Sequence, residues 1–277
     1  MTFIPTTTSE WIAKVARTRE VYARANPPKS PVIKPADFAQ IIDHTLLSLS
    51  ATESDIDTLC AEAREAGFAT VCVRPNYVSR AVQNLRGSSV GLTCVIGFHE
   101  GTYSTEYKVA EAKAALANGA TELDMVINYW RLRAMDYHPV YLDILAVKQV
   151  CAQRAGTKLK VILETSQLDQ DGIMAGCVIA CYAGADFVKT STGFNGPGAD
   201  VESVSLMLAT VDLCGEGTKV KASGGIKTAQ DCAKMIQAGA TRIGTSSGVR
   251  IVNEALQGET EKASKSDAPG AVVSGDY

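Results

Sequence analysis

The sequence predicts an α/β fold of the (β/α)8 barrel type, with an extra N-terminal helix and a flexible C-terminal tail. From residue 38 onward, short apolar or β-branched runs alternate with longer segments of helical period, which is typical of βα units around a parallel sheet. Eight such runs fall within about 210 residues, which fits a closed barrel better than an open sheet. A length of 277 residues with 46% hydrophobic content suits one such barrel.

The eight predicted strands are short and evenly distributed. They are residues 38–45, 69–75, 91–97, 120–128, 158–165, 186–192, 219–225 and 241–247. Apolar residues at helical spacing predict helices between them, for example over 104–119 and 201–211. Gly119, Gly184 and Gly239 stand just before the next strand, where a glycine usually ends a helix. We therefore expect the barrel to occupy residues 36–256.

Two flanking segments lie outside this pattern. Residues 1–35 predict a helix from Ser9 to Ala25, capped by Ser9, and then a proline-rich loop, and we expect this extra segment to cover the bottom of the barrel. Residues 257–277 are polar, rich in Gly, Ser and Ala, and without period. This composition predicts a mobile tail.

Composition also limits the possible partners and location. A net charge of −3 offers no basic surface for nucleic acid or membranes. No apolar run approaches the ~18 residues of a membrane span, and no signal peptide follows Met1.

The eight cysteines are scattered without a CxxC pair, as in the core of a protein from a reducing compartment. The three histidines lie in unrelated segments without ligand spacing. We expect a cytoplasmic protein with no metal and no cofactor.

A lysine stands in the middle of a predicted buried strand, in ADFVKTSTG (185–193). Side chains alternate across a strand, so Phe187 and Lys189 share one face while Val188 takes the other. The apolar partner suits the side that faces the helices. Lys189 should therefore point into the barrel, a volume normally filled by Val, Ile and Leu.

The same alternation turns five more charged side chains inward: Lys221, Asp124, Lys160, Asp43 and Glu164. One interpretation is a buried ion-pair network that only satisfies itself. Such networks contribute little stability, because desolvation offsets most of the attraction. A catalytic role is the other interpretation, and several charges in one barrel interior favour it.

Two lysines on neighbouring strands suggest a specific chemistry. A free lysine has a pKa near ~10.4, but burial and a second cation both disfavour its charged form. A neutral Lys189 beside a cationic Lys221 can attack a carbonyl and form a Schiff base. The protonated imine is an electron sink, so a neighbouring C–C bond can be made or broken without metal. Asp124 could move the protons, directly or through water.

The loops after the seventh and eighth strands read SGGIKT (223–228) and GTSSG (244–248). Small residues, exposed N–H groups and helix N-termini in these two loops are the usual phosphate site of such barrels. The glycines could instead be simple turns. Beside two interior lysines we favour the phosphate site, to which Lys227 adds charge and TSTGFNGPG (190–198) adds backbone donors.

Six stretches together carry a resemblance to a known family. They are IDHTLL (42–47), ELDMVIN (122–128), ILETSQL (162–168), ADFVKTSTG (185–193), VKASGGIKT (220–228) and RIGTSSG (242–248). In this order, from about residue 36 to 248, the chain resembles the deoxyribose-phosphate aldolases, metal-independent class I aldolases with a TIM-barrel fold. The resemblance implies reversible cleavage of 2-deoxy-D-ribose 5-phosphate to acetaldehyde and D-glyceraldehyde 3-phosphate, by a monomer or homodimer.

The resemblance also implies roles for single residues. Lys189 matches the Schiff-base lysine, Lys221 the lysine that perturbs it, and Asp124 the proton-relay carboxylate. Further matches are the secondary site positions Asp43 and Lys160, the active-site cysteine Cys72 and the C-terminal tyrosine Tyr277. The family's phosphate contacts match Gly193, Gly224, Gly225, Gly244, Ser246 and Ser247.

One departure from the family and two alternatives remain. The segment after the third strand reads GFHEGTYSTE, where the family usually keeps a proline-containing turn, so the acceptor range stays open. Another Schiff-base aldolase or a transaldolase acting on a longer sugar phosphate is a second interpretation, against which Lys221 and the loop motifs argue. A catalytically silent barrel that binds a sugar phosphate is the third.

Overall fold

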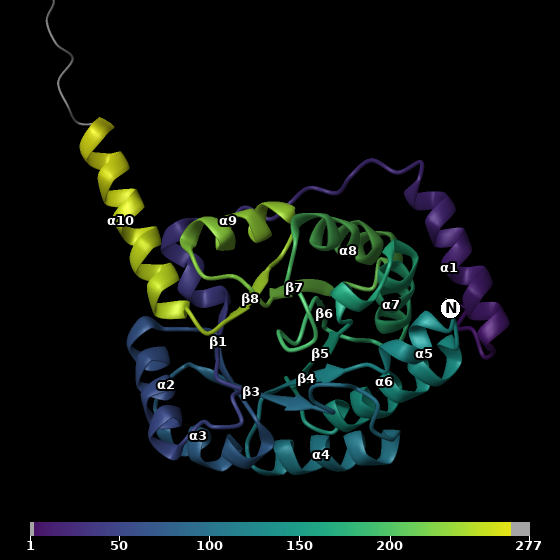
Figure 1. Cartoon of the computed structure of the whole chain (residues 1–277), viewed down its shortest axis with the longest axis horizontal. Helices are drawn as coiled ribbons and strands as arrows, with labels where there is room; N and C mark the ends of the chain where they lie inside the picture. The colour runs from purple at the N-terminus through teal and green to yellow at the C-terminus, as the bar shows by residue number, and fades with distance from the viewer. Residues whose placement is uncertain (1–2, 267–277) are drawn as a thin grey trace, which may run out of the picture.

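The structure, a computed structural model, describes residues 3–266, with side chains as far as residue 259. Eight parallel strands follow one another around a closed barrel in chain order, and β1 pairs with β8 to complete it (Figure 1). Helices connect the strands on the outside. The predicted (β/α)8 barrel is confirmed.

All eight predicted strands are present, and each is shorter than predicted. They are β1 (Ile42–Thr45), β2 (Thr70–Val73), β3 (Gly91–Ile96), β4 (Glu122–Val126), β5 (Lys158–Ile162), β6 (Phe187–Lys189), β7 (Lys219–Ser223) and β8 (Arg242–Thr245). The first predicted strand begins too early, because the short helix η1 (Pro35–Ile41) precedes it. Proline suits the first position of a helix, since its φ is fixed and its missing N–H is not needed there.

The helices surround the barrel in the order of the chain. After α1 (Thr8–Tyr22) they are α2 (Glu53–Ala66), η2 (Pro75–Tyr77), α3 (Val78–Asn84), α4 (Thr105–Ala117), α5 (Tyr129–Arg133), α6 (Tyr137–Ala152), η3 (Thr165–Gln167), α7 (Gln170–Tyr182), α8 (Val201–Cys214), α9 (Ala229–Ala238) and α10 (Gly248–Ser266). The glycines predicted to end helices follow α4, α7 and α9 with positive φ angles. They therefore act as expected.

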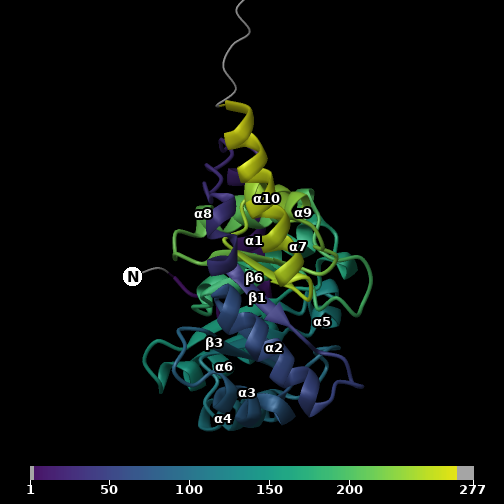
Figure 2. The same cartoon turned by 90° about the vertical axis from the view of Figure 1, so that its left-hand side faces the viewer.

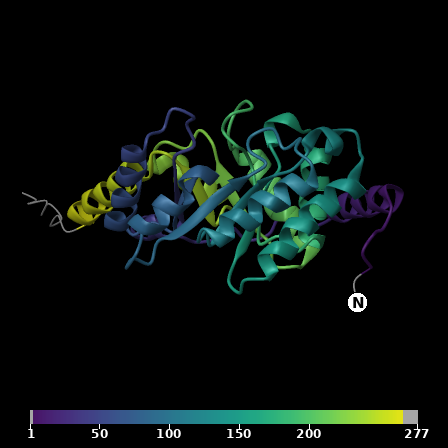
Figure 3. The ribbon, with the colours of Figure 1, turned by 90° about the horizontal axis from the view of Figure 1, so that it is seen from below.

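The extra N-terminal helix exists, but its cap and its place differ from the prediction. Thr7, not Ser9, caps α1: its side chain accepts from Glu10 N, while the Glu10 carboxylate accepts from Thr7 N. The helix packs outside the ring against α6, α7 and α8 (Figures 1 and 3). Its buried Trp11 lies with its ring centroid 5.0 Å from that of Tyr141 on α6. Burial of this apolar stripe, not closure of the barrel bottom, places α1.

The C-terminal segment is partly helical. α10 continues to Ser266, ten residues into the predicted tail, and points away from the barrel (Figure 2). The remainder of the predicted tail, with Tyr277, lies outside the described residues. No helix within residues 3–266 is long and apolar enough to cross a membrane.

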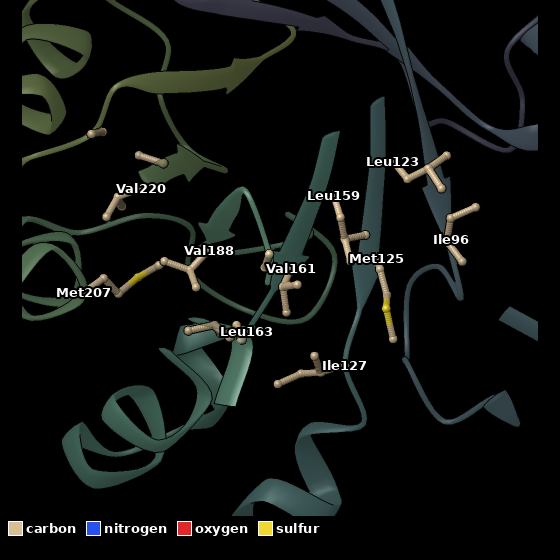
Figure 4. Packing of buried hydrophobic residues seen from close by; sticks show 14 of the residues in the cluster. Ile96, Leu123, Met125, Ile127, Leu159, Val161, Leu163, Val188, Met207 and Val220 are labelled. Carbon is tan, nitrogen blue, oxygen red and sulfur yellow. The ribbon is translucent and has the colours of Figure 1, made fainter. Parts of the chain in front are cut away.

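Strand alternation separates an apolar outer face from a charged interior. Leu123, Met125, Val161 and Val220 belong to the buried cluster between strands and helices, where Met207 of α8 also packs (Figure 4). Side chains of the opposite parity enter the barrel. The register sets two interior pairs side by side, Lys189 with Lys221 and Asp124 with Lys160. The fold thus brings the predicted residues together.

Candidate active site

Asp124 on β4 is the centre of the interior charges. Its Oδ2 accepts from Lys189 Nζ at 2.7 Å and from Lys221 Nζ at 2.8 Å. Its Oδ1 accepts from Lys160 Nζ at 2.8 Å. All four side chains are buried, with Lys189 3% exposed. One carboxylate therefore orients three lysines that come from β5, β6 and β7.

A second layer of charges lies behind this centre. Asp43 contacts Lys221 and accepts from Arg242 Nη1 at 2.6 Å, and Lys160 Nζ lies 3.5 Å from the Asp43 carboxylate. Glu122 contacts Lys160 at 2.6 Å and Arg242 at 2.9 Å. The sequence interpretation missed Glu122 and Arg242. Strand parity could have found both, because Glu122 stands two residues before Asp124 and Arg242 two before Gly244.

The buried charges do not balance while all of these groups are ionised. Three carboxylates face four cations: Asp43, Glu122 and Asp124 against Lys160, Lys189, Lys221 and Arg242. An excess charge in a low-dielectric interior is costly. Charge balance therefore favours the loss of one proton from this group.

The pKa values indicate which group loses the proton. Burial lowers the pKa of Lys189 and outweighs the attraction of Asp124, and the charge of Lys221 lowers it further. Burial also lowers the pKa of Lys221, but the charges of Asp124 and Asp43 outweigh burial, so the pKa of Lys221 is raised. For Asp124, the three lysines outweigh burial and hold its pKa well below the ordinary value. Lys189 is thus the amine of the cluster that gives up its proton most readily, beside a Lys221 whose pKa is raised and an Asp124 whose pKa is lowered.

Glu164 does not join this cluster, contrary to the prediction. β5 ends at Ile162, and Glu164 has a left-handed φ of 60°, so strand alternation no longer sets its direction. Its buried carboxylate accepts from Thr192 N at 3.1 Å and from Asn195 Nδ2 at 3.0 Å. Glu164 therefore holds the loop after β6 in place.

Cys72 on β2 lies fully buried in a small apolar cluster with Leu47 and Val95. Burial and the nearby charge of Asp124 raise the pKa of its thiol to about 11, against the opposing charges of Lys221 and Lys189. A thiol with this pKa is protonated at neutral pH. Cys72 thus borders the charged cluster as a neutral side chain.

A cavity of about 500 Å³ opens above Lys189. It is lined by most of the predicted phosphate residues, namely Gly193, Gly224, Gly225, Lys227, Gly244 and Ser246. Ser247 is not among the lining residues, and its N–H donates to Thr245 Oγ1 at 2.9 Å. Thr45 and Leu47, which the sequence interpretation did not assign, also line the cavity. Lys189 is the cluster lysine that reaches this space.

The loops after β6, β7 and β8, which line the cavity, carry unused backbone donors. Gly193, Gly224 and Gly225 have φ angles of 84°, 86° and 77°, which glycine adopts without strain. Within residues 3–266, their N–H groups and that of Ser246 donate to no other group. Gly244 serves a second purpose, since a Cβ there would lie 3.0 Å from Lys221 Cε. These features suit an anion held by backbone N–H groups.

Aromatic and cationic side chains pack around Phe194, one of the residues that line the cavity. The rings of Phe98 and Phe194 meet edge to face at 5.2 Å, and His99 stacks on Phe194 at 5.1 Å. The Arg74 guanidinium lies 5.2 Å from the Phe98 ring, and its Nε donates to Leu47 O at 2.7 Å. The divergent GFHEGTYSTE segment thus packs Phe98 and His99 against Phe194, which lines the cavity.

The described part of the chain holds no group of three or more side chains placed to bind a metal ion. The arrangement instead offers a buried amine of lowered pKa, an adjacent ammonium, a carboxylate and a separate anion pocket. This set is suited to imine chemistry on a phosphorylated carbonyl compound.

Comparison with known proteins assigns a family. Residues 38–257 match the family described as DeoC/LacD family aldolase. The chain belongs to this aldolase family. A relative of the aldolase in Coccidioides immitis, named deoxyribose-phosphate aldolase, is 62% identical over 231 residues, 83% of this chain and 85% of that protein. One of the same name in Carboxydothermus hydrogenoformans is 48% identical over 82% of this chain and 99% of that protein.

Solved structures agree with the sequence relatives. A crystal structure described as a deoxyribose-phosphate aldolase from Coccidioides immitis has a TM-score of 0.86 and 58% identity, and the match covers 90% of this aldolase and 98% of that chain. A tetrameric deoxyribose phosphate aldolase from Aeropyrum pernix has a TM-score of 0.72 and 37% identity, over 79% of this chain and 91% of that chain.

Proposed function

We propose that this aldolase reversibly cleaves 2-deoxy-D-ribose 5-phosphate to acetaldehyde and D-glyceraldehyde 3-phosphate through a Schiff base on Lys189. The observation that carries the proposal is the shared Asp124 oxygen between Lys189 and Lys221. This arrangement, in a cluster whose charges cancel when Lys189 is neutral, provides a nucleophilic amine at neutral pH.

Lys189 Nζ attacks the C1 aldehyde carbon, and loss of water gives a protonated imine. Removal of the C3 hydroxyl proton then breaks the C2–C3 bond, and its electron pair moves into the imine to give an enamine. D-Glyceraldehyde 3-phosphate leaves. Protonation of C2 and hydrolysis of the imine release acetaldehyde and restore the amine.

Asp124 and Lys221 assist these steps. The ionised Asp124 accepts a hydrogen bond from the amine and stabilises the cationic imine that replaces it. Protons move to and from the substrate through Asp124 and water. Asp43, Lys160, Glu122 and Arg242 hold Asp124 and Lys221 in place from behind, and Cys72 packs beside them.

The 5-phosphate binds at the other end of the cavity. Backbone donors from the loops after β6, β7 and β8 surround this position, and Lys227 adds a positive charge at its rim. We place Gly193, Gly224, Gly225, Gly244 and Ser246 directly in this pocket. Ser247 supports it from the start of α10. Tyr277, outside the described residues, is proposed to relay a proton to the enamine carbon.

The proposed setting is a cytoplasmic enzyme that works as a monomer or homodimer without a cofactor, and that binds neither nucleic acid nor membranes. The described cysteines are all free thiols, which suits a reducing compartment. Light scattering at several protein concentrations measures the oligomeric state. A tetramer, as named for the Aeropyrum pernix protein, would correct it.

A substrate comparison tests the proposal. We expect acetaldehyde and D-glyceraldehyde 3-phosphate from deoxyribose 5-phosphate, and a much higher KM for deoxyribose without phosphate. Lys227→Ala should raise KM for the phosphorylated sugar only, whereas Lys234→Ala, on the exposed surface of α9, is the matched control. Turnover of a ketose phosphate in place of deoxyribose 5-phosphate would support a transaldolase. Binding without turnover of either would support a silent sugar-phosphate barrel.

A further inference from the structure

Three cysteines gather on the outer helices, away from the barrel interior. Cys177 and Cys181 stand one turn apart on α7, and Cys214 is the last residue of α8. α7 and α8 pack side by side. The thiols of Cys181 and Cys214 interact across these two helices, and Thr218 also influences Cys181. Two neighbouring thiols can be joined by a disulfide where the backbone lets their Cα atoms lie within about 7 Å of each other.

Of the three cysteines, only Cys214 is partly exposed, because Cys177 and Cys181 are buried. It opens into a pocket of about 170 Å³ beside Tyr182. The other wall of this pocket comes from the extra helix α1, through Lys14, Arg17, Thr18 and Val21. Small oxidants can therefore reach Cys214 from solvent, while Cys181 lies behind it.

The charged and titratable groups around Cys214 come from each element packed against it. They are Cys177, Cys181 and Tyr182 on α7, Lys14 and Arg17 on α1, and Glu216 after α8. The interaction with Cys181 and the charge of Lys14 lower the pKa of the Cys214 thiol, whereas burial and the charge of Glu216 raise it. The lowering effects are the larger, so the pKa of Cys214 lies below its ordinary value. The pKa values of Cys177 and Cys181 are raised.

We propose that Cys214 and Cys181 form a peroxide-sensitive dithiol, in which Cys214 is the reactive thiol and Cys181 the resolving one. An accessible, activated cysteine next to a second, less reactive one is the usual arrangement of a redox-sensitive pair. Helix α1 takes part, since its Lys14 supports the thiolate of Cys214. This assigns a chemical role to part of residues 1–35 and is independent of the aldolase reaction.

The reaction with hydrogen peroxide balances in two steps. Cys214 thiolate attacks one peroxide oxygen, so that the S–O bond forms, the O–O bond breaks and hydroxide leaves, giving a sulfenic acid. The Cys181 sulfur then attacks the Cys214 sulfur, the S–S bond forms and the S–O bond breaks, and water leaves with the Cys181 proton. The two sulfurs lose two electrons in total, and peroxide is reduced to water.

Mass spectrometry of the full-length protein tests this directly. After limited hydrogen peroxide treatment and alkylation of free thiols, peptide mapping should show a Cys181–Cys214 disulfide that dithiothreitol removes. In Cys181→Ser, dimedone should label Cys214 as sulfenic acid. In Cys214→Ser, neither product should form, while circular dichroism and aldolase activity stay at the wild-type level. Cys151, buried on α6 with a raised pKa, is the internal control.

The contribution of α1 has its own measurement. Lys14→Gln should slow peroxide oxidation of Cys214 several-fold near neutral pH, with the rate recovering at higher pH as the thiol ionises. An unchanged rate would remove Lys14 from the proposal. A disulfide between other cysteines, or Cys214 no more reactive than Cys151, would overturn the proposal itself.

Discussion

Replacement of Lys221 by leucine separates a charge effect from direct contact with the substrate. In the wild type, contacts of 2.7 and 2.8 Å to the same Asp124 oxygen hold the Lys189 and Lys221 nitrogens within 5.5 Å of each other. At an effective dielectric constant of about 20, two positive charges at this distance repel by about 3 kcal/mol. Loss of that repulsion lowers the ratio of neutral to protonated Lys189 about a hundredfold at any given pH.

The assay is the pH dependence of kcat/KM for deoxyribose 5-phosphate cleavage. The pKa of Lys189 is lowered in the wild type, so activity is present above that pKa and is lost as the pH falls through it. In Lys221→Leu this limb should move to higher pH, with activity recovering in alkaline buffer. Lys221→Arg should keep more activity, because it retains the charge, although a larger planar head must fit.

A matched control removes a lysine outside the cluster. Lys148 pairs with Asp186 at 2.6 Å and is partly exposed, so Lys148→Leu should leave the pH profile unchanged. If Lys221→Leu lowers the rate equally at every pH, Lys221 acts by some route other than its charge on Lys189.

Three further predictions concern metal, the C-terminus and the second layer of charges. Exhaustive chelation with EDTA should leave full activity, and loss of activity that Zn²⁺ restores would indicate a metal-dependent mechanism. Deleting Tyr277, or changing it to Phe, should lower kcat and slow solvent proton exchange into acetaldehyde while imine formation on Lys189 persists; wild-type rates would leave the relay to Asp124 and water. Arg242→Met leaves Asp43 and Glu122 without one of their buried partners, so the free energy of unfolding measured in urea should fall by about 3–5 kcal/mol. A loss below about 1 kcal/mol would show that solvent already screens the contacts of Arg242 with these two carboxylates.

Strand alternation predicted most of the interior site. It placed Lys189, Lys221, Asp124, Lys160 and Asp43 inside the barrel because the side chains of a regular strand alternate strictly. Five charges in an apolar volume were then enough to indicate a functional centre.

The wrong predictions concern residues beyond the end of a regular strand and helices whose limits or positions depend on contacts that the local sequence does not show. Glu164 follows the end of β5 in a left-handed conformation, so its parity carried no information. The cap of α1 depended on a reciprocal Thr7–Glu10 contact instead of on the first helix-like residue. The position of α1 depended on tertiary burial of Trp11. The polar composition after residue 256 predicted a tail without helix, but α10 continues through these residues to Ser266.

The second layer of the site was missed for a different reason. Glu122 and Arg242 have the correct parity, but they stand at the starts of short strands, where a charged residue usually faces solvent. Only the closed barrel shows that the two side chains meet across its interior, at 2.9 Å. Partners this far apart in the chain cannot be paired from one sequence.

Borohydride trapping tests the central claim most directly. Incubation with deoxyribose 5-phosphate or acetaldehyde and sodium borohydride should inactivate the enzyme and reduce the imine to a stable adduct, which peptide mass mapping should locate on Lys189. Lys189→Leu should remain folded, because leucine fills a barrel layer without a charge to desolvate, and should show neither adduct nor turnover. An adduct on another lysine, or full turnover without any adduct, would contradict the assignment of Lys189.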